Sequence, residues 1–249
     1  MSFIKRLLRK VLIPIFPELR PKTKRTLTEK FGALREFQLN APSHQWKHLL
    51  YHNELCQLVE NVPGDFAEFG VAGGTTFISL ARILDVKDAG KSPAEIRHIY
   101  GFDSFEGLPA LDDTVDVGLK QNDEMIQGGY YDPKGNKELF EYIKDKENLH
   151  LIKGWFNETL PPFLQERSHI SFSLIHMDAD LYSSTLEVLK NIWPHVSPGG
   201  IIVFDELFNA AFPGETEAFR EFFEDKAGKF ELTHSENRRD KKILRKIST

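Results

Sequence analysis

The stretch FAEFGVAGGTTFISLARIL, residues 66–84, decides the fold that we expect for this chain. Its first part is a short apolar run that predicts a strand over 66–71, and its last part has the apolar periodicity of a helix. Between them lie Gly70, Gly73 and Gly74. Glycines let the backbone turn tightly and approach a ligand, and the following helix N-terminus adds free amides. Such a unit opens a ligand-binding α/β domain.

Strand and helix patterns alternate on both sides of this unit. Further strands are expected over 98–104, 149–154, 170–179 and 201–206, and helices over about 45–60, 184–195 and 216–225. Ser184 and Glu187 have the spacing of a capping box for one helix, and Pro198-Gly199-Gly200 predicts a turn before the fifth strand. Apolar strands that alternate with helices belong in a parallel sheet covered on both faces.

The last two expected strands, FELTHS and KKILRKIS, are separated only by a short polar turn around Asn237. Strands joined by so short a connection must be antiparallel. We therefore expect an α/β fold with a mostly parallel sheet that is mixed at one edge.

Composition indicates one soluble domain with an appendage. The 249 residues are 41% hydrophobic and include 20 Phe, enough apolar surface for a core. No apolar run approaches the roughly 20 residues that cross a bilayer. The single cysteine, Cys56, excludes an intrachain disulfide and suits a reducing compartment, so we expect a cytoplasmic protein.

The N-terminal segment is basic, in contrast to the rest of the chain. Residues 1–30 hold nine Lys and Arg against two Glu, so this segment carries +7 and, with a net charge of −5, the remainder carries −12. An acidic body argues against nucleic-acid binding. We expect a basic arm over 1–40 and a domain over 41–249. The arm could lie on an anionic membrane, or it could be solvated or pack on a subunit, and the latter is favoured. Residues 110–147 form a long polar insert, expected to be a mobile cover over the site.

Acidic residues follow several expected strands. Asp103 ends the second strand and could accept hydrogen bonds from a ribose diol, although a turn aspartate is the alternative. Asp178 follows the fourth strand, and Asp205 and Glu206 follow the fifth. These three carboxylates would repel one another at one sheet edge, and Mg²⁺ is the natural counter-ion, unless they cap helices or bind backbone amides. His176 is expected to be a core histidine rather than a base.

The motifs FAEFGVAGGTT, IYGFDSFEGLP, IKGWFNETLP, HMDADLYSST and SPGGIIVFDE, in this order, resemble a class I S-adenosylmethionine (SAM) dependent methyltransferase, and more narrowly the macrocin O-methyltransferase (TylF/MycF-like) family of sugar-modifying enzymes. The resemblance covers about residues 64–223. It implies a Rossmann-like, seven-stranded sheet with an antiparallel last strand and helices on both faces. It also suggests a homo-oligomer, since arms in this family can complete a neighbouring active site.

The resemblance also implies a role for each matching residue. The cofactor-binding set would be Glu68, Gly70, Gly73 and Thr75 at the methionine end of SAM, Asp103 and Ser104 at the ribose, and Gly154 and Trp155 at the adenine. The metal ligands would be Asp178, Asp205 and Glu206. Asp178 would also be the general base. Related enzymes usually have Asp-Asp or Asp-Asn where this chain has Asp205-Glu206. This departure from the family pattern concerns the metal ligands and not the residues that would bind SAM.

The expected function is therefore transfer of a methyl group from SAM to a sugar hydroxyl of a natural product or polysaccharide, assisted by Mg²⁺. Two alternatives stay open: a metal-independent methyltransferase that uses Asp178 or His176 as its base, and a non-catalytic scaffold that keeps the SAM fold. A dinucleotide oxidoreductase is more remote, because the glycine loop is not GxGxxG.

Overall fold

The structure is a computed structural model that describes residues 27–112, 114–116 and 131–248. The chain divides into two units, Met1–Trp46 and Lys47–Thr249. In the described part of the first unit, α3 (Leu27–Asn40) precedes the start of α4 (Ser43–Leu58), and the Phe37 and Trp46 ring centroids lie 4.9 Å apart. Most of the expected basic arm lies outside the described residues, and its boundary at residue 40 stays a prediction. No helix in the described ranges is long and apolar enough to cross a membrane.

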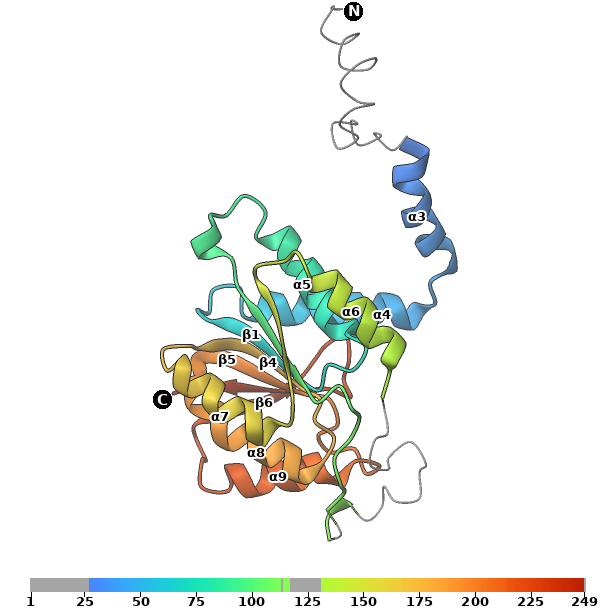
Figure 1. Ribbon diagram of the computed structural model, residues 1–249. Coiled ribbons are helices and arrows are strands. Elements are labelled where there is room, and N and C mark those ends of the chain that lie inside the picture. Colours follow the sequence, from blue (N-terminus) through green and yellow to red (C-terminus); the bar gives the residue numbers. More distant parts are fainter. Residues whose placement is uncertain (1–26, 113, 117–130, 249) are drawn as a thin grey trace, which may run out of the picture. The chain divides into compact units, whose positions relative to one another are not determined.

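The second unit contains one seven-stranded sheet in the order β3-β2-β1-β4-β5-β7-β6 (Figure 1). The strands are β1 (Asp65–Phe69), β2 (Ile99–Asp103), β3 (Leu149–Lys153), β4 (Phe172–Met177), β5 (Val196–Phe204), β6 (Phe230–His234) and β7 (Lys242–Lys246). The first five are parallel, whereas β7 lies antiparallel between β5 and β6. The predicted fold class and the mixed edge are confirmed.

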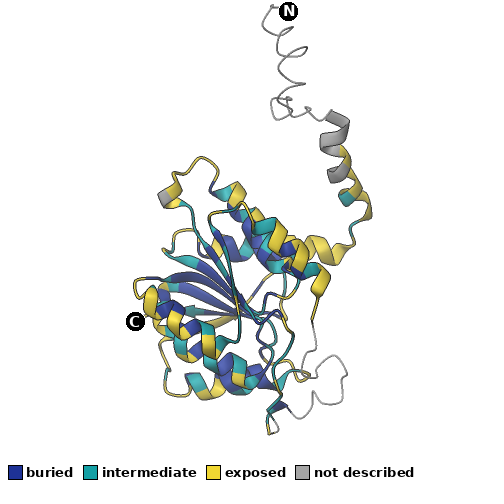
Figure 2. Cartoon of the chain, in the orientation of Figure 1, coloured by how far each residue is buried: buried dark blue, intermediate teal, exposed yellow. Residues whose placement is uncertain are grey.

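Helices cover both faces of this sheet, and the central strands β1, β4 and β5 are mostly buried between them (Figures 1 and 2). One face packs against α4, α5 (Thr75–Lys87) and α6 (Pro133–Ile143), and the other against α7 (Phe156–Glu166), α8 (Tyr182–Ile192) and α9 (Pro213–Phe223). Two short 3-10 turns, η3 (Pro93–Glu95) and η6 (Trp193–His195), complete the described helical elements. Along β4 the side chains alternate, so that Leu174 enters the first layer and Ile175 the second. This arrangement explains the uninterrupted apolar runs, because every position of a central strand meets a helix.

The predicted turn at Pro198-Gly199-Gly200 is wrong, because these residues lie inside β5. The register between β4 and β5 shifts between Phe172 and Leu174, which accommodates the extra residues. Gly199 has φ of 81° and its carbonyl accepts a 2.6 Å hydrogen bond from Arg245. The turn residues therefore form an irregularity within the strand and do not precede it.

The capping box predicted for Ser184 and Glu187 is also wrong. Helix α8 begins at Tyr182, and its N-cap Leu181 supplies no side-chain hydrogen bond. Instead, the fully buried Asp116 accepts a 3.4 Å hydrogen bond from the Tyr182 amide. The helix N-terminus is thus satisfied by a carboxylate from the 110–147 insert. Residues 117–130 of that insert lie outside the described residues, and α6 (Pro133–Ile143) follows them within the insert.

The turn between β6 and β7 is held by Glu54 of α4. The Glu54 carboxylate accepts hydrogen bonds from the Ser235 hydroxyl at 2.7 Å, the Glu236 amide at 2.8 Å, and the Asn237 amide and side chain at 3.2 and 2.8 Å. Burial raises the pKa of Glu54, but these hydrogen bonds outweigh it and the pKa lies below its usual value. One carboxylate therefore anchors three consecutive residues of the turn.

We expect Glu54→Ala to lower the free energy of unfolding by about 2 kcal/mol, since it removes hydrogen bonds to a charged group. Urea unfolding followed by circular dichroism measures this. Glu60→Ala is the matched control, because Glu60 is exposed and forms a surface ion pair with Lys87 at 3.3 Å, a type of pair worth about 0–1 kcal/mol. Equal losses in the two variants would contradict this role of Glu54.

Candidate active site

A cavity of about 760 Å³ lies at the carboxyl ends of the parallel strands. It is lined by seven of the residues that the sequence predicts for the site: Gly70, Asp103, Ser104, Gly154, Trp155, Asp178 and Glu206. In a parallel sheet the strands end at one edge, so residues far apart in the chain meet there. The cavity is thus bounded on one side by the glycine loop and on another by carboxylates.

Asp103 holds the glycine loop in place. Its Oδ2 accepts hydrogen bonds from the amides of Val71 at 2.7 Å and Ala72 at 2.8 Å, and its Oδ1 accepts one from Phe105 at 2.6 Å. These hydrogen bonds are those of a turn aspartate, which is the alternative that the sequence left open for Asp103. A carboxylate has about four lone-pair sites, so the same side chain can still accept a hydrogen bond from a ligand in the cavity.

Among the residues that the structure describes, four other than glycine adopt positive φ, and all follow strand ends at this edge of the sheet. They are Ala72 (45°) after β1, Phe105 (52°) after β2, Asp180 (58°) after β4 and Phe208 (68°) after β5. Such conformations cost about 1–3 kcal/mol each and concentrate at functional sites. The first three line the cavity. The backbone strain thus coincides with the cavity.

Glu68 points away from the cavity toward a buried histidine. Its side chain is 1% exposed, and its Oε1 lies 3.4 Å from Nδ1 of His176, which is 2% exposed. Burial raises the pKa of Glu68, although His176 opposes this effect. His176 Nε2 lies 4.0 Å from Oδ1 of Asp205. The histidine is therefore buried between two carboxylates, as a core residue is, and not in the cavity wall.

Carboxylates from β4 and β5 converge beneath the cavity. Burial, and then the charge of Asp205, raises the pKa of Asp178 well above its usual value. Burial and the charge of Glu206 raise the pKa of Asp180 to about 7. Glu215, at the start of α9, is fully buried, and its Oε1 accepts a 3.0 Å hydrogen bond from the Glu206 amide. Helix α9 thus positions Glu206.

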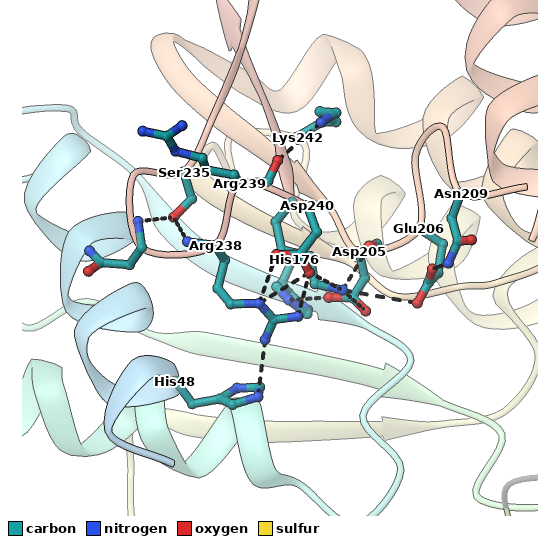
Figure 3. Close-up of polar contacts among 12 residues, drawn as sticks. His48, His176, Asp205, Glu206, Asn209, Ser235, Arg238, Arg239, Asp240 and Lys242 are labelled. Carbon is teal, nitrogen blue, oxygen red and sulfur yellow. Dashed lines mark hydrogen bonds and ion pairs between the residues drawn. The ribbon is translucent and has the colours of Figure 1, made fainter. Parts of the chain in front are cut away.

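Lys241 is the ammonium that contacts this cluster most closely among the described residues. Its Nζ lies 2.6 Å from Oδ2 of Asp205 and 4.0 Å from Oε1 of Glu206. Burial raises the pKa of Asp205, but His176 and Lys241 more than offset this and hold the pKa below its usual value. Figure 3 shows Asp205 next to His176, on the side that faces Glu206. Lys241 is not among the site residues predicted from the sequence.

The remaining predicted residues lie close to the cavity without lining it. Thr75 is exposed in the first turn of α5. At Gly73, an added Cβ would lie 2.7 Å from Asp132 Oδ2, so the loop packs against the start of α6. That helix contributes Asn136, a residue that the sequence analysis missed. Asn136 is 8% exposed and lines the cavity, and its Oδ1 makes no hydrogen bond to a described residue.

Asp178, Asp205 and Glu206 offer carboxylate oxygens, which are the ligand atoms that a hard divalent cation such as Mg²⁺ prefers. Asp178 and Glu206 line the cavity, and burial first, with the charge of Asp205 as a smaller cause, raises the pKa of both side chains. In the described ranges, however, no three Asp, Glu, His or Cys side chains are arranged as a ready ligand set. Asp205 is instead paired with Lys241.

The strand order, with an antiparallel β7 between β5 and β6 and a glycine loop after β1, defines the class I SAM-dependent methyltransferase fold. The solved structure of the calicheamicin methyltransferase CalS11 shares it, with a TM-score of 0.74 and 28% identity over 97% of this chain and 89% of that one. The chain belongs to the macrocin O-methyltransferase (TylF) family, whose model matches residues 50–237.

Curated relatives support the same family. The chain is 30% identical over 154 residues to the 8-demethyl-8-(2,3-dimethoxy-alpha-L-rhamnosyl)-tetracenomycin-C 4'-O-methyltransferase of Streptomyces olivaceus, covering 60% of this chain and 55% of that protein. It is 29% identical over 181 residues to the mycinamicin III 3''-O-methyltransferase of Micromonospora griseorubida, covering 70% of this chain and 65% of the relative. The matched region thus spans between half and two thirds of the length of these relatives.

Proposed function

We propose that this protein is a SAM-dependent O-methyltransferase that methylates a hydroxyl of a sugar on a small natural product. The observation that carries the proposal is the cavity, which places the Asp103-held glycine loop and the Asp178 carboxylate in one space of about 760 Å³. A methyl donor and a hydroxyl acceptor would have to meet in such a space. The relatives named above methylate sugar-bearing compounds by their names.

The backbone of this chain suits SAM at the glycine loop. Gly70 has φ of 88°, and an added Cβ there would lie 1.9 Å from the carbonyl oxygen of Asp178, so no side chain fits at this position. We assign the methionine end of SAM to this loop with Glu68 and Thr75 nearby, the ribose to Asp103 and Ser104, and the adenine to Gly154 and Trp155. When bound, the cofactor would supply an electrophilic methyl group on a sulfonium.

Asp178 is the proposed general base. Asp178 lines the cavity, and burial together with neighbouring negative charge raises the pKa of its carboxyl group. A raised pKa makes a carboxylate a stronger proton acceptor, so Asp178 can take the proton of the acceptor hydroxyl, a step worth about 10²- to 10⁴-fold in rate. The cavity wall would hold the acceptor oxygen in line with the reacting methyl group, which can supply roughly 7–11 kcal/mol.

We include assistance by Mg²⁺ in this proposal. Asp178, Asp205 and Glu206 would hold the ion, which would supply Lewis acidity toward the acceptor hydroxyl. The metal-independent alternative is favoured by a specific observation, the Lys241 ammonium at 2.6 Å from Asp205. Activity that survives exhaustive chelation would select that alternative. The scaffold alternative is disfavoured because the chain retains the mutually repelling carboxylates.

The other expected properties stay predictions. They are a cytoplasmic location, a homo-oligomer, a natural product or glycan as acceptor, no nucleic-acid partner, and membrane or subunit contact through the basic arm. The arm falls mostly outside the described residues. Flotation with liposomes, comparing the full chain with a variant that lacks residues 1–25, tests the membrane contact.

Calorimetric titration with S-adenosylhomocysteine (SAH), the product of SAM, tests the cofactor site. We expect micromolar binding by the full chain and loss of that binding in Asp103→Ala, because Asp103 holds the loop through the Val71 and Ala72 amides. Repeating the titration with Mg²⁺ and with EDTA shows whether a metal contributes. Asp85→Ala is the control, since Asp85 is a surface residue of α5 with a side chain that is 41% exposed. Absence of SAH binding by the full chain in both buffers would overturn the proposed function.

A further inference from the structure

The turn between β6 and β7 delivers a lysine to a carboxylate that we assign to metal binding. Lys241 Nζ lies 2.6 Å from Asp205 Oδ2 and donates a 2.8 Å hydrogen bond to the Asp205 carbonyl. We propose that the Lys241 ammonium competes with a divalent cation for Asp205 and Glu206, so that Lys241 sets the metal affinity of this protein. This inference rests on the Mg²⁺ part of the proposed function.

Lys241 is held at this place and is not a freely moving surface lysine. Its side chain is only 8% exposed. The turn that carries it is fixed by Glu54, through the hydrogen bonds described above, and by Arg238. The Arg238 guanidinium contacts Asp240 at 2.6 Å and His48 at 3.1 Å (Figure 3). The Lys241 amide also donates a 2.9 Å hydrogen bond to the Arg238 carbonyl.

The position of Lys241 follows from the strand order. Phe204 of β5 pairs with Lys242 of β7 in an antiparallel register. The residue that follows Phe204 is therefore opposite the residue that precedes Lys242, which places Asp205 beside Lys241. Lys242, one residue further, instead directs its Nζ to the Arg239 carbonyl at 3.2 Å. The two neighbouring lysines thus differ in the group that they contact.

A cation and the Lys241 ammonium cannot share Asp205 without cost. Mg²⁺ binds its oxygen ligands at about 2.0–2.1 Å and demands near-ideal octahedral geometry. Lys241 already lies within hydrogen-bond distance of Oδ2 and 4.0 Å from Glu206 Oε1, so a bound divalent ion would meet a positive charge close by. Metal binding at Asp205 therefore requires the ammonium to withdraw or to accept strong repulsion.

The charge of the cluster explains why a cation would nevertheless enter. Asp178, Asp180 and Glu206 line the same cavity, and Asp205 directly precedes Glu206 in the chain. Lys241 contacts Asp205 directly, whereas the Asp178 carboxylate is not among its ion pairs. One ammonium therefore leaves most of the negative charge at this edge uncompensated.

Calorimetric titration of the full chain with MgCl₂ tests the proposal, with wild type, Lys241→Met and Lys242→Met compared. We expect Lys241→Met to bind Mg²⁺ at least about tenfold more tightly than wild type, because the competing charge is gone. Lys242→Met should match wild type, since Lys242 contacts a carbonyl outside the cluster. Equal or weaker affinity in Lys241→Met, including no binding in either protein, would overturn the proposal.

Thermal unfolding provides a second measurement on the same proteins, with Lys241→Gln added in case Lys241→Met folds poorly. In EDTA the Lys241 variants should melt at a lower temperature than wild type, since the carboxylates lose their partner. Excess Mg²⁺ should raise their melting temperature more than it raises that of wild type, because a ligand stabilises the state that it binds. Equal Mg²⁺ shifts in all proteins would contradict the competition. SAH titration of wild type separates the outcomes: normal SAH binding with unchanged Mg²⁺ affinity removes this inference alone.

Discussion

Asp178→Ala is expected to lower methyl transfer by about 10²- to 10⁴-fold, because the variant lacks the proposed proton acceptor. Asp178 lines the cavity, and its pKa is raised by burial and by the charge of Asp205. Both features suit a base that accepts a proton from a hydroxyl. SAH affinity should stay within about a few-fold of wild type, since the loop and ribose contacts come from other residues. Turnover assays and SAH calorimetry on the same preparation measure the two effects.

Asp178→Asn provides the matched control for this prediction. The amide keeps the size of the side chain but accepts no proton, so this variant should be as inactive as Asp178→Ala. The backbone carbonyl of Asp178, which faces Gly70, is retained in both variants, and the glycine loop should keep its shape. Wild-type turnover in either variant would remove Asp178 from the role of base. Loss of SAH binding together with turnover would instead make Asp178 a structural residue of the cofactor site.

The strands could be predicted from the sequence because each central strand is buried on both faces. IIVF of β5 and FSLIHM of β4 are apolar runs with polar residues directly after them, and that change marks the sheet edge where the cavity lies. The same logic predicts that Asp178, Asp205 and Glu206 meet at this edge, and two of them, Asp178 and Glu206, line the cavity, whereas Asp205 pairs with Lys241. The prediction depends only on parallel strands ending together.

Contacts made by distant segments could not be predicted in this way. The N-terminus of α8 is satisfied by Asp116 from the insert, so local capping signals at Ser184 and Glu187 were misleading. Lys241 meets Asp205 because β7 lies next to β5, a neighbour relation that no local pattern reveals. Asn136 likewise reaches the cavity only through the packing of α6 on the glycine loop. Long-range packing decides these positions.

Gly70→Ala is expected to destabilise the protein by more than about 3 kcal/mol, beyond the usual cost of overpacking, and to abolish SAH binding. An added Cβ at Gly70 would lie 1.9 Å from the Asp178 carbonyl oxygen, an overlap with backbone that no side-chain rotation relieves. The Asp178 amide donates a 2.9 Å hydrogen bond to the Phe69 carbonyl, so β1 and β4 are tied together at this point. The methyl group would force their ends apart and displace both the loop and Asp178.

Gly90→Ala separates this overlap from ordinary backbone strain. Gly90 has φ of 91°, nearly that of Gly70 at 88°, but a Cβ there would meet no atom within 4 Å. In both variants the alanine must adopt a left-handed backbone conformation, which costs roughly 1–2 kcal/mol. Only Gly70→Ala adds the collision with Asp178. Urea unfolding and SAH calorimetry should therefore show a modest loss of stability with normal SAH binding in Gly90→Ala. Similar behaviour of the two variants would mean that backbone strain, and not the contact between the glycine loop and the base, makes Gly70 necessary.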